Sequence, residues 1–169
     1  MMKNIFRVPV DEKHFTDTIE KGKAYHQINR FLTFTEREKI TKISDDLVFQ
    51  YWGSIAGASN QRTFTRIQEG DEISFYRAGK YIGIATIAFS TINSLLAPYS
   101  WGERKDKATW ELIYFLKDVQ IISVAAKTVN KAFGYKENAP VMGFSMVSEE
   151  IAKQFFEKYG SVADFVKQL

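Results

Sequence analysis

Residues 70–88, GDEISFYRAGKYIGIATIA, are the stretch of sequence that decides the fold. They contain two runs rich in β-branched and aromatic residues, a composition that favours strands. Residues 77–80 (RAGK) separate the runs, and Gly79 can adopt the positive φ that a short hairpin loop requires. Gly83 interrupts the second run, which is typical of a bulge or of a close backbone approach. The stretch therefore predicts a β-hairpin at the centre of the domain.

The composition is that of one globular domain with an excess of aromatic rings. The chain has 169 residues, of which 45% are hydrophobic and 25% charged, and we expect residues 1–169 to form a single domain with a sizeable core. Aromatic residues make up 15% of the chain, more than such a core needs, so we expect some at a surface or in a pocket. The net charge of +3 permits a polyanionic partner without requiring one.

Residues that carry catalysis are poorly represented. There is no cysteine, which excludes disulfides and thiolate zinc sites, and the two histidines, His14 and His26, are isolated. Ser59 is not in a nucleophile-elbow motif, and residues 53–57 (GSIAG) lack the lysine of a phosphate-binding loop. We therefore expect no catalytic residue, no metal ligand and no cofactor. Without a signal peptide or an apolar run of membrane-spanning length, the expected compartment is the cytoplasm.

Upstream of the hairpin, short elements of both kinds are predicted. Residues 3–10 have an extended pattern, and Asp11 is suited to cap a helix from residue 12 to about residue 21. Thr35 with Glu38 matches a capping box, which predicts another short helix. Residues 47–52 have the pattern of a strand, residues 53–59 that of a loop, and Asn60 is placed to cap a helix through residue 67.

Downstream, the same mixture continues. A short helix ended by Pro98 is predicted before a polar, basic segment, and apolar strands are predicted at residues 110–116 and 119–124. A helix at 125–133 and a strand at 141–147 follow, and Ser148 and Ser161 are placed to cap the last two helices. Strands and helices do not alternate as in a βαβ fold, so we expect an α+β domain with a curved, mostly antiparallel or mixed sheet.

Two tryptophans flank the hairpin at positions of functional interest. Trp52 ends a predicted strand, and Trp101 stands in a polar segment with little apolar company nearby. Such a tryptophan either packs back onto the core or offers a flat face to a ligand. Trp110, in contrast, begins an apolar run and is expected in the core.

The order of motifs resembles a known family. The motifs are residues 51–67 (YWGSIAGASNQRTFTRI), the hairpin at 70–87, residues 100–107 (SWGERKDK), 110–119 (WELIYFLKDV) and 138–150 (NAPVMGFSMVSEE). Over residues 48–150 this order resembles the YTH domain and its EVE relatives in the PUA-like superfamily. The resemblance implies a curved mixed sheet or open barrel flanked by short helices.

The resemblance also implies a base-binding site. In YTH domains two tryptophans form a cage around a methylated adenine, and Trp52 and Trp101 match them by position. The implied site comprises cage residues Trp52, Trp101, Tyr51 and Tyr99, polar base contacts Ser54, Asn60 and Asp11, and phosphate contacts Arg62, Arg66, Arg104, Lys105 and Lys107. The sequence departs from the family at Gly53, where YTH domains often have serine or threonine, and in an insertion at residues 23–46. The insertion leaves helix capping as the competing role for Asp11.

A restriction system is the biological setting that the resemblance implies. YTH-like and EVE-like domains serve as DNA-recognition modules of McrB-type modification-dependent restriction proteins, whose partners are an AAA+ GTPase motor and a nuclease subunit. The leading hypothesis is non-catalytic recognition of a methylated base in DNA, N6-methyladenine first and methylated cytosine second. Recognition of modified RNA by a YTH or EVE protein is the alternative, and a structural or protein-interaction domain is a third hypothesis.

Overall fold

A computed structural model describes residues 2–169 and shows a curved seven-stranded mixed sheet. The strands are β1 (Ile5–Pro9), β2 (Lys23–Ala24), β3 (Val48–Ser54), β4 (Glu72–Arg77), β5 (Lys80–Ile92), β6 (Leu112–Ala125) and β7 (Ser145–Met146). Their order is β2-β3-β6-β5-β4-β1-β7, and only the β1–β4 pair is parallel within the described residues. Because β2 and β7 do not pair with each other, the sheet stays open, which confirms the predicted α+β class.

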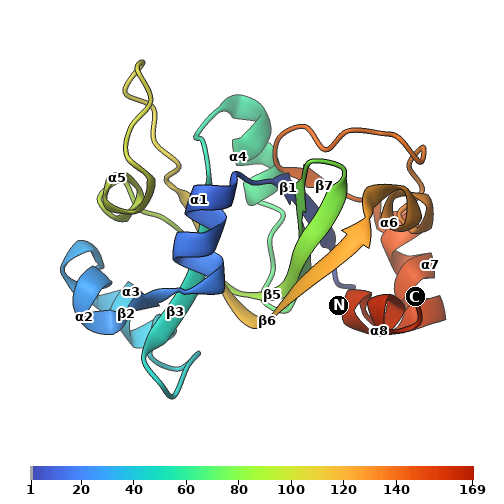
Figure 1. The fold of residues 1–169 in the computed structure, drawn as a ribbon. Helices are drawn as coiled ribbons and strands as arrows, with labels where there is room; N and C mark the ends of the chain where they lie inside the picture. Colours follow the sequence, from blue (N-terminus) through green and yellow to red (C-terminus); the bar gives the residue numbers. More distant parts are fainter. Residues whose placement is uncertain (1) are drawn as a thin grey trace.

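Short helices cover the sheet. They are α1 (Glu12–Phe15), η1 (Thr16–Glu20), α2 (Tyr25–Ile28), η2 (Asn29–Phe31), α3 (Phe34–Ile40), α4 (Ala58–Phe64), α5 (Leu96–Trp101), α6 (Ala126–Ala132), α7 (Glu149–Tyr159) and α8 (Val162–Lys167). Figure 1 shows α2, α3 and α5 gathered on one side of the molecule and α6, α7 and α8 on the other. No helix in residues 2–169 is both long enough and apolar enough to cross a membrane.

The central hairpin forms as predicted. Arg77 pairs with Lys80, and the two residues between them, Ala78 and Gly79, have φ values of 49° and 80°. Two consecutive positive φ values define the type I′ turn that fits the twist of a tight hairpin. At Gly83 a Cβ atom would lie 2.9 Å from the Phe15 ring, so the predicted close approach is the contact between β5 and α1.

Two apolar clusters occupy the two faces of the sheet. Along β1, Phe6 packs into the larger cluster, which includes the ring pair Phe15 and Phe75. Ile5 points the other way, into a cluster beneath α6, α7 and α8 that contains Phe155. The alternation follows from the two-residue period of a strand, and it makes β1 an interior strand with both faces covered.

Helix caps were predicted well where the capping side chain acts locally. Asp11 accepts the backbone N–H of His14 at 2.9 Å and caps α1, which continues as the π-helical turn η1. Ser148 and Ser161 cap α7 and α8 through the N–H groups three residues on. These three caps confirm the helix starts expected from the sequence.

Other predicted boundaries are wrong. The capping box is formed by Thr33 with Glu36 at the start of α3, and α4 begins after Gly57, so Asn60 lies inside that helix. Pro98 lies in the first turn of α5 rather than ending a helix, a position where the missing N–H has no intrahelical partner to lose. Of the strand expected at 141–147, only the two residues of β7 are in a strand. The two strands expected between residues 110 and 124 form one continuous strand, β6.

Glu36 should be a strong determinant of stability. Its buried carboxylate accepts hydrogen bonds from the Thr33 N–H (2.8 Å), the Thr91 hydroxyl (2.6 Å) and the Asn93 amide (2.9 Å). Because Glu36→Ala leaves these donors without an acceptor, we expect the free energy of unfolding to fall by about 3 kcal/mol in chemical denaturation. Glu38→Ala, on the exposed face of α3, is the control and should change it by less than about 0.5 kcal/mol. Equal effects would contradict the prediction.

Candidate functional site

A pocket of about 210 Å³ opens where the end of β1, the end of β3 and the segment before β6 meet. Its lining combines aromatic, small and polar side chains: Val8, Pro9, Asp11, Trp52, Gly53, Ser54, Ile55, Asn60, Trp110, Gly143 and Phe144. Sites for drug-sized ligands run from about 300 to 1,000 Å³. This pocket is smaller, and its size suits one flat group such as a single nucleobase.

The curvature of the sheet brings its separate strands to this pocket. Phe144 stacks on Phe6 of β1 and on Tyr114 of β6, with ring centroids 5.2 Å apart in both pairs. Strand β3 pairs with β6, so Trp52 lies opposite Tyr114 and Ser54 lies two residues further on the same face. The Ser54 and Tyr114 hydroxyls are 3.2 Å apart. A single aromatic stack therefore joins β1 to β6 and gives the pocket a fixed floor.

Trp52 and Trp101 lie in direct contact, whereas the cage hypothesis requires a gap between them wide enough for one base. Their ring centroids are 5.7 Å apart at an interplanar angle of 57°, and both side chains are more than nine-tenths buried. Aromatic rings 4.5–7 Å apart are in direct contact. The rings therefore fill the space between them. Trp52 lines the pocket, and Trp101 packs behind Trp52 at the end of α5.

Trp110 is the residue that sequence reasoning missed. It was expected in the core because an apolar run follows it. Its half-buried side chain does pack against the larger core cluster, but β6 begins only at Leu112. It lines the pocket together with Trp52, and its ring centroid lies 6.4 Å from that of His14. The polar Glu111, which separates Trp110 from the apolar run, was the available signal.

All three predicted polar contacts lie at the pocket. Asp11 accepts the His14 N–H and lies 2.8 Å from the His14 ring nitrogen Nδ1. Partial burial, the largest single influence, raises the pKa of Asp11, but the hydrogen bonds and charge of His14 together bring that pKa below its ordinary value. Asn60 donates its amide to the Ile55 carbonyl at 2.9 Å, which fixes its side chain at the rim. The pocket thus holds an ionised acceptor beside aromatic walls.

Three of the four predicted cage residues lie outside the pocket lining: Trp101, which packs behind Trp52, and both tyrosines. Tyr51 is fully buried on the opposite face of β3, where its hydroxyl is 2.7 Å from Ser100 Oγ and burial raises its pKa above the ordinary tyrosine value. Tyr99 stacks on Phe31 with ring centroids 4.5 Å apart. The structure therefore gives both tyrosines packing roles away from this pocket.

The predicted phosphate contacts are exposed, and several pair with carboxylates. Arg66 pairs with Glu149, Arg104 with Asp106 at 3.3 Å, and Lys107 with Glu103 at 3.7 Å. Exposed ion pairs contribute little, so these cations can exchange partners for a phosphate. The remaining two, Arg62 and Lys105, are exposed and form no ion pair within residues 2–169. In Figure 1 the loop that follows α5 and carries Arg104, Lys105 and Lys107 projects from the body of the domain.

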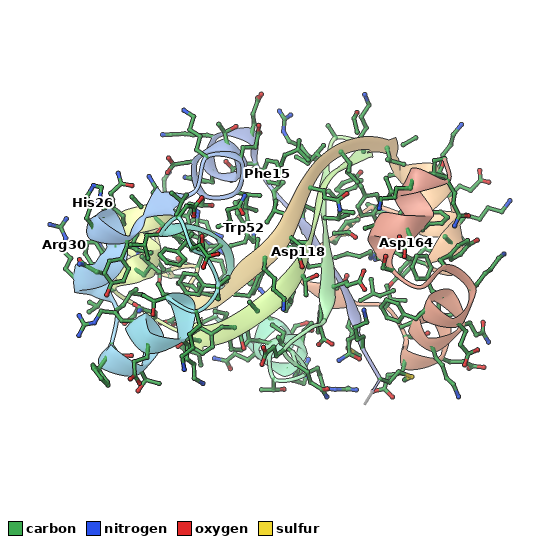
Figure 2. The ribbon with its side chains drawn as sticks, turned by 90° about the horizontal axis from the view of Figure 1, so that it is seen from below. Phe15, His26, Arg30, Trp52, Asp118 and Asp164 are labelled. Carbon is green, nitrogen blue, oxygen red and sulfur yellow. The ribbon has the colours of Figure 1, made fainter. Side chains whose placement is uncertain are left out.

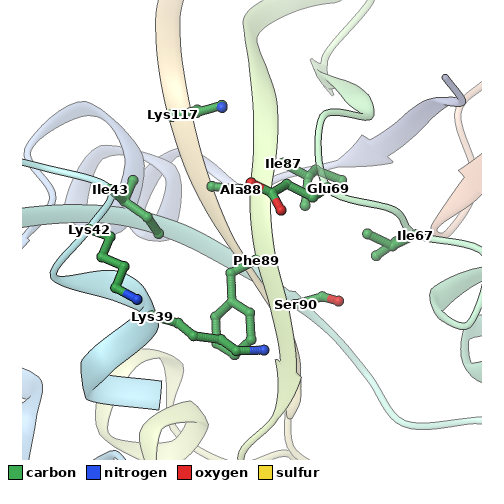
Figure 3. Close-up of a pocket in the computed structure, with 10 residues that line it drawn as sticks. All are labelled: Lys39, Lys42, Ile43, Ile67, Glu69, Ile87, Ala88, Phe89, Ser90 and Lys117. Atoms are coloured by element: carbon green, nitrogen blue, oxygen red, sulfur yellow. The ribbon is translucent and has the colours of Figure 1, made fainter. Parts of the chain in front are cut away.

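A larger hollow, of about 680 Å³, lies between α3 and the middle of β5 and β6. Figure 3 shows the side chains of Lys39, Lys42 and Lys117 around it. Its one ring, Phe89, has the Lys39 ammonium 4.9 Å from its centroid and stacks on Phe115. The Phe89 ring already contacts Lys39 and Phe115, and none of the predicted base contacts lines the hollow. The larger volume of the hollow is therefore no reason to prefer it as the candidate site.

Comparison with known proteins supports the fold. The sequence matches no protein-family model and no curated protein. Among solved structures, the N-terminal domain of Thermococcus gammatolerans McrB bound to m5C DNA superimposes with a TM-score of 0.68 at 15% identity, covering 92% of this chain and 96% of that chain. The chain has the fold of this McrB domain. This confirms the fold that the sequence resemblance implied.

Two further structures are more distant. The YTH domain of Zygosaccharomyces rouxii MRB1 protein in complex with N6-methyladenosine RNA has a TM-score of 0.49 at 10% identity, covering 94% of this chain and 85% of that chain. Protein Atu2648 from Agrobacterium tumefaciens has a TM-score of 0.47 at 14% identity, covering 90% of this chain and 93% of that chain.

Proposed function

We propose that this chain is a binding module that recognises a methylated base in DNA, without catalysing a reaction on it. The observation that carries the proposal is the convergence of Trp52, Trp110 and Asp11 on one base-sized pocket. The base leaves the duplex and enters the pocket, where one face contacts Trp52 and Trp110 bounds another side. Trp101 supports Trp52 from behind and so holds the wall of the cage in place.

The cost of extruding the base and the gain from stacking it in the pocket are both a few kcal/mol and have opposite signs. Extruding a base costs a few kcal/mol. Stacking in an aromatic pocket returns about 1–3 kcal/mol per base. A methyl group buried against an indole adds about 0.8 kcal/mol, which alone gives roughly fourfold selectivity. Lysine and arginine contacts to phosphates supply much of the affinity and make it fall with salt.

Asp11 narrows the choice of base. An ionised carboxylate only accepts hydrogen bonds, and the exocyclic amines of adenine and cytosine are donors that match it. N6-methyladenine retains one such N–H and 5-methylcytosine retains two. We propose N6-methyladenine as the preferred base, following the YTH resemblance, and methylated cytosine as the second, which is the base in the DNA bound to the McrB domain.

The fold shared with McrB also supports a proposal about the setting. The domain would act as the specificity module of a modification-dependent restriction system in the cytoplasm. Its partners there would be an AAA+ GTPase motor and a nuclease subunit.

A binding panel tests the proposed function. Duplexes and single strands of one sequence, unmodified or carrying N6-methyladenine or 5-methylcytosine, are titrated at two salt concentrations, with RNA strands of the same sequence alongside. We expect the methylated DNA to bind more tightly than its unmodified counterpart at both salt concentrations. Equal affinity for modified and unmodified DNA would reject the proposal, and tighter binding to modified RNA would favour the RNA-reading alternative.

Asp11→Asn should separate helix capping from base recognition. Asparagine caps helices as well as aspartate does, so the thermal stability should change little. Loss of the charged acceptor should weaken binding of methylated DNA by about tenfold, because hydrogen bonds to charged groups contribute about 1.5–3 kcal/mol. Asp164→Asn is the charge-matched control, since Figure 2 shows Asp164 far from Trp52. If both variants bind alike, Asp11 is only a cap.

The charge of Asp11 also sets an expected pH profile. Hydrogen bonds from His14 keep the pKa of Asp11 below its ordinary value, despite the opposing effect of burial. The carboxylate is therefore ionised above about pH 5, and we expect its contribution to binding to be constant between about pH 5 and 7 and to be lost only at lower pH.

A further inference from the structure

Met142 lies in the loop between α6 and β7 and is the most exposed of the large apolar side chains in residues 2–169. Its exposed fraction is 80%. The next two residues, Gly143 and Phe144, line the base pocket. A large apolar side chain is therefore exposed to solvent on the residue that directly precedes two residues of the pocket lining.

The residues around Met142 are anchored. Val141 is 5% exposed and Phe144 is 4% exposed, and Phe144 is held by its stacks on Phe6 and Tyr114. Met142 is thus carried between two buried side chains, and Gly143, with φ of 68°, makes the turn that separates it from Phe144. The exposure of Met142 is built into this loop and does not come from a loosely held segment.

A buried amide holds the earlier part of the same loop. Asn130, which is 0% exposed, donates its side-chain amide to the carbonyls of Glu137 (3.2 Å) and Ala139 (3.0 Å). The loop is therefore fixed at both ends. Because the backbone of the loop is already ordered, binding a partner restricts only the side-chain rotamers of Met142.

We infer that Met142 is a wedge that enters the duplex as the methylated base leaves it. The inference rests on the proposed function and specifies its target as base-paired DNA. Extrusion leaves a gap in the stack, and methionine is one of the apolar side chains that proteins insert between bases. Because Met142 directly precedes Gly143 and Phe144, one loop supplies both the pocket floor, through Phe144, and the group that fills the gap.

Other exposed apolar residues do not have this relation to the pocket. Phe34, Ile92 and Leu95 are 67%, 62% and 65% exposed, and none of them neighbours a residue of the pocket lining in sequence. Singly exposed apolar side chains are common and need no explanation. They provide matched controls, of which Leu95→Ala is the closest in size and exposure.

The test compares Met142→Ala, Met142→Leu and Leu95→Ala on methylated duplex and on the same methylated strand without its complement. We expect Met142→Ala to bind the duplex about tenfold more weakly and the single strand within about twofold of the parent, because a single strand has no paired stack to open. Met142→Leu and Leu95→Ala should resemble the parent on both. A mismatch opposite the methylated base should shrink the Met142→Ala deficit, because a mispaired base is easier to extrude.

The outcomes separate this inference from the proposed function. The wedge is overturned if Met142→Ala weakens binding of duplex and single strand equally, or weakens neither. The proposed function still stands in that case, provided that the parent binds methylated DNA selectively. If the parent itself binds methylated and unmethylated DNA alike, the proposed function fails. A fluorescent 2-aminopurine placed next to the methylated base provides a second readout, since Met142→Ala should reduce its unstacking signal on duplex DNA.

Discussion

Gly53→Ala should destabilise the protein by about 3 kcal/mol or more. A Cβ atom at this position would lie 2.3 Å from the Trp110 carbonyl oxygen and 2.6 Å from Cζ3 of Trp101. The first neighbour is backbone, and the second belongs to a ring held between Tyr51 and Trp52 at centroid distances of 5.5 and 5.7 Å. The Trp110 carbonyl cannot move without its backbone, and the Trp101 ring cannot move without displacing Tyr51 or Trp52, so the strain is not relieved locally.

Chemical denaturation of Gly53→Ala beside Gly57→Ser measures this effect. Nothing lies within 4 Å of a Cβ at Gly57, which is the N-cap of α4, so serine there should leave the stability equal or slightly higher. A Gly53→Ala protein as stable as the parent would show that the contact of Trp101 with β3 is loose.

Gly53 also explains a departure from the YTH pattern. The residue after the first cage tryptophan is often serine or threonine in those domains, and here the space for any side chain is occupied by Trp101 and the Trp110 carbonyl. The substitution of glycine is therefore linked to the position of Trp101, which ends α5 instead of lying in an open loop. In this chain the three tryptophans meet around a single glycine.

Sequence reasoning succeeded where neighbouring residues decide the structure. The hairpin turn needs only the residues between its strands, and the caps at Asp11, Ser148 and Ser161 act on N–H groups three residues away. It failed at α3, where both Thr33–Glu36 and Thr35–Glu38 fit the capping pattern. Thr91 and Asn93 decide between them by binding the Glu36 carboxylate, and they lie more than 50 residues along the chain.

The site was predictable only in part for the same reason. Trp52 and Ser54 were expected at the site from the YTH resemblance, and both line the pocket, although β3 continues through Ser54 where a loop was predicted from residue 53. Phe144 joins it through the curvature of the sheet, which stacks Phe144 on Phe6 and Tyr114. No local pattern encodes contacts between segments so far apart. Trp101 was expected in a polar segment, either packed on the core or facing a ligand, and α5 buries it against Tyr51 and Trp52.

Trp52→Ala should nearly abolish selective binding of methylated DNA. Stacking on an aromatic side chain contributes about 1–3 kcal/mol per base, so removing the wall lowers affinity by roughly 5- to 150-fold. The indole is 6% exposed, and its removal should also lower the free energy of unfolding by about 3–5 kcal/mol. Weaker binding by this variant alone therefore does not distinguish a lost wall from a disturbed fold.

Trp110→Ala resolves that ambiguity, because Trp110 is half-buried and precedes β6 rather than lying within it. We expect it to retain a cooperative unfolding transition and to lose about tenfold in affinity for methylated DNA. Tyr99→Ala, which removes an aromatic ring outside the pocket, should bind like the parent. Calorimetry of the three variants, alone and with methylated and unmethylated duplexes, gives both the stability and the affinity.

If Trp110→Ala binds normally while Trp101→Ala, once shown to be folded, loses methyl selectivity, the base lies between Trp52 and Trp101. The two indoles must then separate on binding, because the 5.7 Å between their centroids leaves no room for a third ring.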